Sequence, residues 1–341
     1  MTENTRLDWL DAAKGFGIIL VIYAHIDNSL LRTLIYTFHV PLFFFLSGFV
    51  YSNAGSFKDF FLKKAKSLIT PYFIYGVIII IWQISTSTKQ YTWAAFLDLI
   101  KCFLVQNRMW TLWFIACLFC LNIIFYCVEH ILKTTFKIGC FTFVFFISGI
   151  LYYRYGGTSL PWNIDVCSMV LPFFFAGYIC KKNWISICKT FNTTFSTSSL
   201  LVLCCVINIS LGLISLNISG QNVDIFYNQY GFIPFTYLSA ISGIAAVIII
   251  SHKAKPKAIQ YIGRNSLIYF ALHQQIFIAL VKDILKFMGI VLDNSWNQYQ
   301  IVLYNMLITF LILILITLCR FVYVALKAGI NILTKHLPRA M

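Results

Sequence analysis

Charged residues are scarce in this sequence, and acidic ones most of all. Only 11% of the 341 residues are charged and 11 are Asp or Glu, whereas 60% are hydrophobic and 18% are aromatic. A soluble globule could not keep that much apolar surface away from water. The composition therefore excludes a soluble protein and is typical of a chain that crosses a membrane several times.

The sequence also lacks the residue spacing of a metal site. It has 11 cysteines, and several lie inside apolar runs, where they behave as small buried hydrophobes (Cys117, Cys120, Cys127, Cys204 and Cys205). No pair has zinc-ligand spacing with a companion pair, so we expect neither a metal nor disulfides. The net charge of +15 comes from short basic clusters between apolar runs, as in cytoplasmic loops, and we expect no nucleic-acid partner.

Ten apolar segments have lengths that suit helices crossing a bilayer. They are residues 10–27, 34–52, 70–85, 110–130, 137–153, 165–180, 198–216, 230–251, 264–281 and 301–325. A further stretch, 91–106, has an apolar face at helical spacing and is expected to lie in the membrane interface. No repeat, soluble domain or linker is evident. The sequence therefore predicts an all-α, polytopic membrane protein whose single domain fills residues 1–341.

Basic residues orient the predicted bundle. Most of the 26 lysines and arginines fall at the two ends of the chain and in alternate loops, around residues 58–66, 133–137, 181–189 and 253–264. Cytoplasmic loops carry such an excess of basic residues. We therefore expect both termini in the cytoplasm, an even number of spans, and a multi-pass location in the cell (plasma or inner) membrane.

The first span carries a polar stripe made of Asp11, Lys14 and His25. At about 100° per residue, their spacing places all three on one face of a helix. Lys14 and His25 are roughly 16 Å apart along the axis, so they cannot touch and would serve different parts of one long ligand. Asp11, about 21 Å from His25, is expected to pair with Lys14 or to serve the same end.

Two more histidines fall in apolar spans. His39 begins the second span from the outer side, and it comes near His25 if the first two spans are antiparallel neighbours. His273 lies near the middle of the ninth span. Ionisable side chains inside a bilayer are costly unless they are paired or face a wet cavity, so the sequence predicts a polar interior site. The alternative for His39 and His273 is a hydrogen bond between helices.

The residues around these positions resemble the acyltransferase-3 family of integral membrane O-acyltransferases. Lys14 and His25 match its Arg/Lys-x10-His signature, and the string from His39 to Gly48 follows. Further matches are the basic segment 63–68 with Pro71-Tyr72, the tryptophan motif 110–114, the Pro/Gly segment 172–177 and the segment from Gly263 to His273. Within the family, the segments are most similar to the fucose 4-O-acetylase-like and surface-polysaccharide acetyltransferases.

The resemblance implies an acyl-CoA donor, with acetyl-CoA as co-substrate and no tightly bound cofactor. Its polyanionic nucleotide cannot enter hydrocarbon, so it would rest against cytoplasmic cations while the pantetheine arm threads inward. The cations placed to bind it are Lys14, Lys63, Lys64, Lys66 and Arg264. Lys63 and Lys66 stand where the family has paired arginines, and they lose the bidentate geometry of arginine on phosphate. The loop lysines also have an alternative explanation, because topology alone accounts for them.

In this scheme His25 meets the thioester and acts as general base toward an acceptor hydroxyl. The residues expected to support the site or line its cavity are Asp11, His39, Ser47, Trp113 and His273. Ser47 with Gly48 has the alternative role of permitting close helix packing, and Trp113 with Trp110 that of an interfacial aromatic belt. The sequence leaves open whether acetyl passes directly to the acceptor or first forms an acyl-imidazole on His25.

The predicted acceptor is a hydroxyl of a cell-surface polysaccharide or of its lipid-linked precursor, handled within a membrane domain that contacts lipid. A homo-oligomer is compatible with the sequence. The alternative function is that of a transporter or flippase for a glycan precursor, in which the polar stripe lines a pathway and no bond is made. A third reading keeps the fold and changes the acyl group to succinyl or another short chain.

Overall fold

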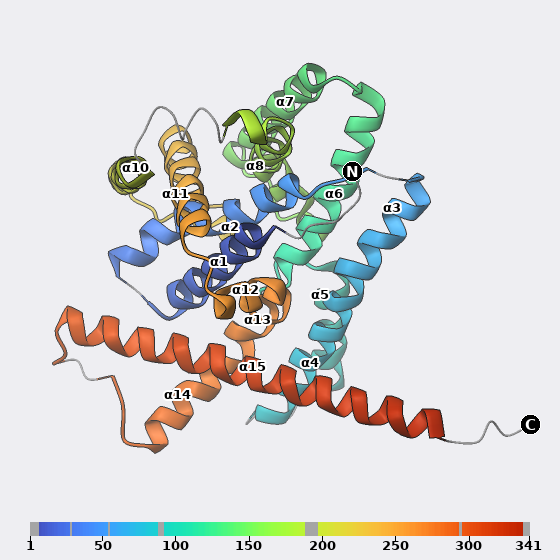
Figure 1. The fold of residues 1–341 in the computed structure, drawn as a ribbon, viewed down its shortest axis with the longest axis vertical. Coiled ribbons are helices and arrows are strands. Elements are labelled where there is room, and N and C mark those ends of the chain that lie inside the picture. Colours follow the sequence, from blue (N-terminus) through green and yellow to red (C-terminus); the bar gives the residue numbers. More distant parts are fainter. Residues whose placement is uncertain are drawn as a thin grey trace, which may run out of the picture.

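The computed structural model describes residues 7–27, 29–53, 55–87, 92–187, 197–292 and 295–336, with side chains up to residue 327. Within these ranges the protein is built from helices, with no β-strand (Figure 1). Tyr91, the first residue of the expected interfacial segment, and Lys189, in the third basic loop, lie outside the described residues.

Ten helices in this part of the chain are long and apolar enough to cross a membrane, which confirms the ten predicted spans. They are α1 (Asp8–Ile26), α2 (Leu30–Phe49), the run of α3 (Phe57–Lys64), η1 (Ala65–Ile69) and α4 (Thr70–Thr86), α6 (Trp113–Leu132), α7 (Thr135–Arg154), η2 (Pro161–Asn163) with α8 (Ile164–Lys182), α10 (Thr197–Ser219), α11 (Ile233–Lys253), the run of α13 (Ser266–Leu272), η4 (His273–Phe277) and α14 (Ile278–Phe287), and α15 (Gln298–His336). The shorter elements are α5 (Trp93–Val105), η3 (Ile225–Tyr227) and α12 (Lys257–Arg264). The number of spans is even, while the side of the membrane that the ends face stays a prediction.

The third span begins earlier than the sequence analysis predicted. It starts at Phe57, because Ser56 and Asp59 form a capping box that satisfies the first backbone N–H groups of α3. The lysines that follow read as a loop in the sequence, yet they lie on the first turns of one helical run that ends at Thr86. The expected interfacial segment is also helical: α5 packs on α4 through Phe103, whose ring lies parallel to that of Tyr72 with centroids 4.9 Å apart.

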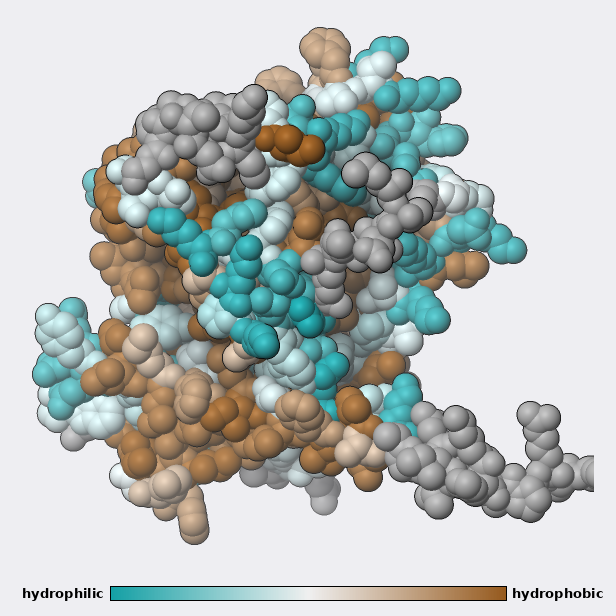
Figure 2. Space-filling view, viewed as in Figure 1, coloured by the Kyte–Doolittle hydropathy of each residue, from teal (hydrophilic) through white to brown (hydrophobic). Residues whose placement is uncertain are grey.

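The two N-terminal spans form the centre of the bundle. In α1 and α2, 67% and 72% of the residues in the spanning window are buried, compared with 17% in α7 and 22% in α10. Figure 1 shows α1 in the middle, with α15 crossing on one side and α7, α8, α10 and α11 on the other. Figure 2 shows apolar surface over α15 and α10, and a polar band between them around α12. Within this centre Asp11 is buried, and Lys14 and His25 are half-buried.

Two glycines allow α12 to pack directly on the first half of α1. A Cβ atom at Gly263 would lie 1.8 Å from the carbonyl oxygen of Asp11, and one at Gly15 would lie 2.1 Å from the carbonyl oxygen of Ile259. Both contacts are with backbone atoms, which cannot move aside without shifting a helix. The close approach brings Arg264, at the end of α12, next to Asp11 on α1.

Replacing Gly263 with alanine should therefore destabilise the protein by about 1–3 kcal/mol or more, because the methyl group forces α1 and α12 apart. The measurement is thermal unfolding of the purified protein in detergent. Gly139→Ala is the matched control, since its new Cβ would meet only ring atoms of Phe175, at an ordinary 3.4 Å. Equal melting temperatures for the two variants would contradict the packing argument.

Candidate functional site

Three histidines from three helical segments meet at the end of the bundle where α1 finishes, which we call the histidine end. The ring centroids of His25 and His273 are 4.9 Å apart, and those of His25 and His39 are 6.3 Å apart. His25 is contributed by α1, His39 by α2, and His273 by the π-helical turn η4. The antiparallel pairing of the first two spans thus brings His39 to His25, as the sequence analysis expected.

Each of these histidines donates its Nδ1–H to a backbone carbonyl oxygen three or four residues earlier. The acceptors are Val21 at 2.7 Å for His25, Ile35 at 3.0 Å for His39, and both Tyr269 and Phe270, at 3.0 and 2.9 Å, for His273. A neutral ring with its proton on Nδ1 has a lone pair on Nε2. His25 is half-buried, whereas His39 and His273 are 4% and 0% exposed. The Nε2 atom of His25 is therefore the best placed of the three to accept a proton from a ligand.

A cavity of about 350 Å³ opens beside His25 and His39. We call it the histidine cavity. Its wall has aromatic rings, two glutamines of η4 and residues of the segment around η3: Arg32, Tyr36, Val40, Trp110, Thr111, Trp113, Asp224, Ile225, Phe226, Tyr227, Phe270, Gln274 and Gln275. Apolar rings combined with a few polar groups are typical of sites that bind small molecules.

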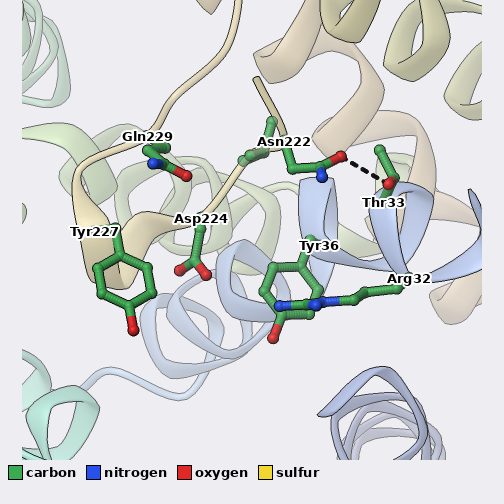
Figure 3. Close-up of a pocket in the computed structure, with 8 residues that line it drawn as sticks. Arg32, Thr33, Tyr36, Asn222, Asp224, Tyr227 and Gln229 are labelled. Atoms are coloured by element: carbon green, nitrogen blue, oxygen red, sulfur yellow. Dashed lines mark hydrogen bonds between the residues drawn. The ribbon is translucent and has the colours of Figure 1, made fainter. Parts of the chain in front are cut away.

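A second cavity, also about 350 Å³, adjoins the first, and we call it the vestibule (Figure 3). The two share four lining residues: Arg32, Tyr36, Asp224 and Tyr227. The vestibule also has carboxamides and a hydroxyl in its wall, from Asn222, Gln229 and Thr33. Figure 3 shows the carboxylate of Asp224 between the rings of Tyr227 and Tyr36. Because the shared residues line both spaces, a ligand in the vestibule lies next to the histidine cavity.

Arg32 and Tyr36 form an aromatic and cationic side of the vestibule. The guanidinium carbon of Arg32 lies 4.8 Å from the centre of the Tyr36 ring, and that ring lies 4.7 Å from His39. The positions of Arg32, Tyr36 and His39 along α2 place them on one face of that helix. The polar face of α2 therefore continues from the vestibule to the histidines.

The other end of α1 carries an ionic contact with α12. Asp11 is buried and accepts a hydrogen bond of 2.9 Å from Nε of Arg264, whose guanidinium also lies 3.6 Å from the carboxylate of the exposed Asp8. Lys14 is half-buried on α1, one turn after Asp11. The structure thus brings Arg264 to Asp11 and to the turn that precedes Lys14. At 1.5 Å per residue this group is roughly 16 Å or more from His25, as the helix spacing predicted.

Lys63, Lys64 and Lys66 form a second basic group, on α3 and η1. Lys63 and Lys66 are exposed, and Lys64 is half-buried, with its ammonium 5.5 Å from the centre of the Phe60 ring. The segment that carries them packs against α6. It continues into α4, which contacts α13. These lysines are therefore placed on a helical span and not in a loop.

The other predicted site residues divide into two groups. Trp113 is buried and, with the half-buried Trp110, lines the histidine cavity, which favours the cavity role over the aromatic belt. His273 is fully buried behind His25, and its Nε2 atom has no hydrogen-bond partner. Ser47 lines neither cavity. Its neighbour Gly48 permits close packing, because a Cβ there would lie 1.9 Å from the carbonyl oxygen of Phe174.

Several residues of the two cavities escaped the sequence analysis. Arg32 precedes His39 by about two turns on the same helix and Tyr36 by about one, and that spacing was a usable signal. Asp224 and Tyr227 lie between spans and reach the site only through the folding of α10 and α11 against α2. The scarcity of acidic residues was the only sequence signal for Asp224.

Comparison with known families identifies the family of this chain. Residues 7–325 match the family model of the acyltransferase-3 family, described as an acyltransferase domain. Searches of curated proteins and of solved structures found no match. Because the family match covers nearly the whole chain, it confirms the resemblance carried by the short motifs. The protein belongs to the acyltransferase-3 family and is a multi-pass membrane acyltransferase.

Proposed function

We propose that this protein transfers an acetyl group from cytoplasmic acetyl-CoA to a hydroxyl of a cell-surface polysaccharide or its lipid-linked precursor, with His25 as general base. The proposal places it in the cell membrane with both termini in the cytoplasm. One observation carries it: α1 bears a histidine that faces a cavity at one end, and at the other end it bears Lys14, close to Arg264 of α12. A donor with a polyanionic head and a thin reactive arm matches that separation.

The donor is assigned to the cationic end because its phosphates need partners. Arg264 is exposed and directs its guanidinium toward Asp8 and Asp11, with Lys14 one turn further along α1. Phosphates form strong charge-assisted hydrogen bonds with such groups. Lys63, Lys64 and Lys66 supply further positive charge from the same predicted side of the membrane.

The acceptor is assigned to the vestibule because of its lining. Carboxylate, carboxamide and phenol groups accept and donate hydrogen bonds at fixed positions, as recognition of several sugar hydroxyls requires. The vestibule adjoins the histidine cavity, so a hydroxyl placed there reaches His25 without crossing the bundle. A glycan would then approach from the side opposite to the CoA.

The chemistry at His25 needs one proton acceptor. Nε2 of His25 takes the proton from the acceptor hydroxyl while the hydroxyl oxygen attacks the carbonyl carbon of the thioester. The carbon–sulfur bond then breaks. The departing thiolate takes the proton back from the imidazolium of His25. The bond from Nδ1–H to the carbonyl oxygen of Val21 holds the ring in the tautomer that this step uses.

Replacing His25 with alanine should lower acetyl transfer from labelled acetyl-CoA into membrane glycan by about 10²–10⁴-fold, while the protein still inserts and folds. His130→Ala is the matched control, because His130 stacks on Tyr126 near the far end of α6. Transfer at the wild-type rate by the His25 variant would reject the general base.

Binding of CoA should raise the melting temperature of the purified protein. At a CoA concentration 100 times Kd the gain is about 2.7 kcal/mol. We expect Lys14→Ala to reduce this gain and Lys101→Ala, an exposed lysine on α5, to leave it unchanged. A wild-type protein that CoA does not stabilise would reject CoA as the carrier of the acyl group.

Burial raises the pKa of the Asp224 carboxyl above its usual range. The folded state therefore gains stability from this group at low pH and loses it as the pH rises through the raised pKa. Asp224→Asn removes that loss, so the variant should melt above the wild type at about pH 8, with a difference that shrinks on acidification. Thermal scans across pH test this, and a difference independent of pH would contradict it.

A further inference from the structure

A buried ion pair joins the segment before α6 to the start of α8. Arg108 and Asp165 are in direct contact, and their side chains are 10% and 2% exposed. Two charges taken out of water are costly unless further hydrogen bonds satisfy them. The partners of this pair therefore indicate what it is for.

The partners connect α8 to the wall of the histidine cavity. Asp165 also accepts hydrogen bonds from the carboxamide of Asn228, at 3.2 Å, and from a backbone N–H, that of Leu160. The other terminal nitrogen of Arg108 donates to the carbonyl oxygens of Phe226 and of Ile225, the latter at 3.4 Å. Ile225 and Phe226 both line the histidine cavity. Arg108 thus holds the backbone of the cavity wall against a fixed carboxylate.

Arginine suits this position because its planar fork can serve two acceptors in different directions, whereas lysine has one compact ammonium group. In addition, Nε of Arg108 is buried without a hydrogen-bond partner. An unsatisfied buried donor lowers stability. The side chain is therefore held in an arrangement that stability alone does not favour.

The backbone around Arg108 also adopts unfavourable conformations. Gln106, Arg108 and Trp110 have φ angles of 50°, 53° and 51°, and none of them is a glycine. Such conformations persist only where surrounding contacts enforce them, and they cluster at functional sites. Here the carboxamide of Gln106 accepts from the N–H of Met109 at 2.7 Å and donates to the hydroxyl of Tyr72 at 3.0 Å.

The same short segment reaches the helix of His273. Thr111 donates a hydrogen bond of 2.9 Å to the carbonyl oxygen of Ala271, two residues before His273. Trp110 and Thr111 themselves line the histidine cavity. The residues from 106 to 111 therefore contact both the Ile225–Tyr227 turn and the helical run that carries His273.

We propose that Arg108 is a positioning residue for acyl transfer, which fixes η3 across the cavity from His25 so that the acceptor hydroxyl meets Nε2. This inference rests on the proposed function. Arg108 acts through Ile225 and Phe226 and does not touch the reacting atoms. Loss of the hydrogen bonds from Arg108 to Ile225 and Phe226 lets η3 move away, which misplaces the acceptor and exposes His25, while the cationic end of α1 is unaffected.

The test compares Arg108→Lys with Asn208→Ala. Asn208 is a buried control, since its carboxamide bonds Ser239 and Thr37 on α11 and α2 and it lines neither cavity. Acetyl transfer is measured in membranes with labelled acetyl-CoA. We expect Arg108→Lys to lower the maximal rate by about 10- to 100-fold and to leave the KM for acetyl-CoA unchanged.

The second readout needs no acceptor. Diethyl pyrocarbonate modifies accessible imidazole, and mass spectrometry reports the rate at His25. Arg108→Lys should speed this modification by roughly threefold or more, because local opening exposes the ring, whereas Asn208→Ala should not. If Arg108→Lys does not insert, Asn228→Gly removes one link to Asp165 and tolerates the φ of 57° at that position.

Each outcome decides a different statement. Unchanged transfer and unchanged labelling of His25 in the variant that folds would overturn the positioning role, and so would losses no larger than those of Asn208→Ala. A wild-type protein that transfers no acetyl group would instead overturn the proposed function, and the labelling rate would still report whether Arg108 holds η3 in place.

Discussion

The central constraint on this structure is that polar groups inside an apolar helix bundle must find partners within the protein. A bilayer offers no water to hydrogen-bond an exposed polar group in its core. The helix α1 meets this requirement at both ends, with Asp11 against Arg264 and His25 bonded to its own backbone. The packing that makes α1 one of the three most buried spans, with α2 and α8, therefore also determines where a polar site can exist.

Sequence reasoning succeeded where a property is carried by one continuous segment. The ten spans follow from the length of apolar runs, and the shared face of Lys14 and His25 follows from helical periodicity. The pairing of His39 with His25 needed only that consecutive spans pack as antiparallel neighbours. In each case the physical cause is local, so the residues alone contain it.

What could not be predicted depends on contacts between distant segments. Asp165 on α8 meets Arg108 before α6, and Asp224 reaches the vestibule from the connection between α10 and α11. The lysines of α3 were wrongly predicted to lie in a loop, because a cluster of charged residues is typical of loops between spans. In the structure they belong to a helix that begins after the capping box of Ser56 and Asp59. The sequence gives no spacing rule for such contacts, and three-dimensional packing alone creates them.

The glycine contact between α1 and α12 limits how the enzyme can change shape. Gly15 and Gly263 pack directly against carbonyl oxygens of the opposite helix. The two helices therefore have no free volume between them in which to slide. They behave as a single rigid body that carries Lys14 and Arg264 at a constant distance. Any change of shape in this part of the bundle must therefore come from the other helices, while α1 and α12 move together.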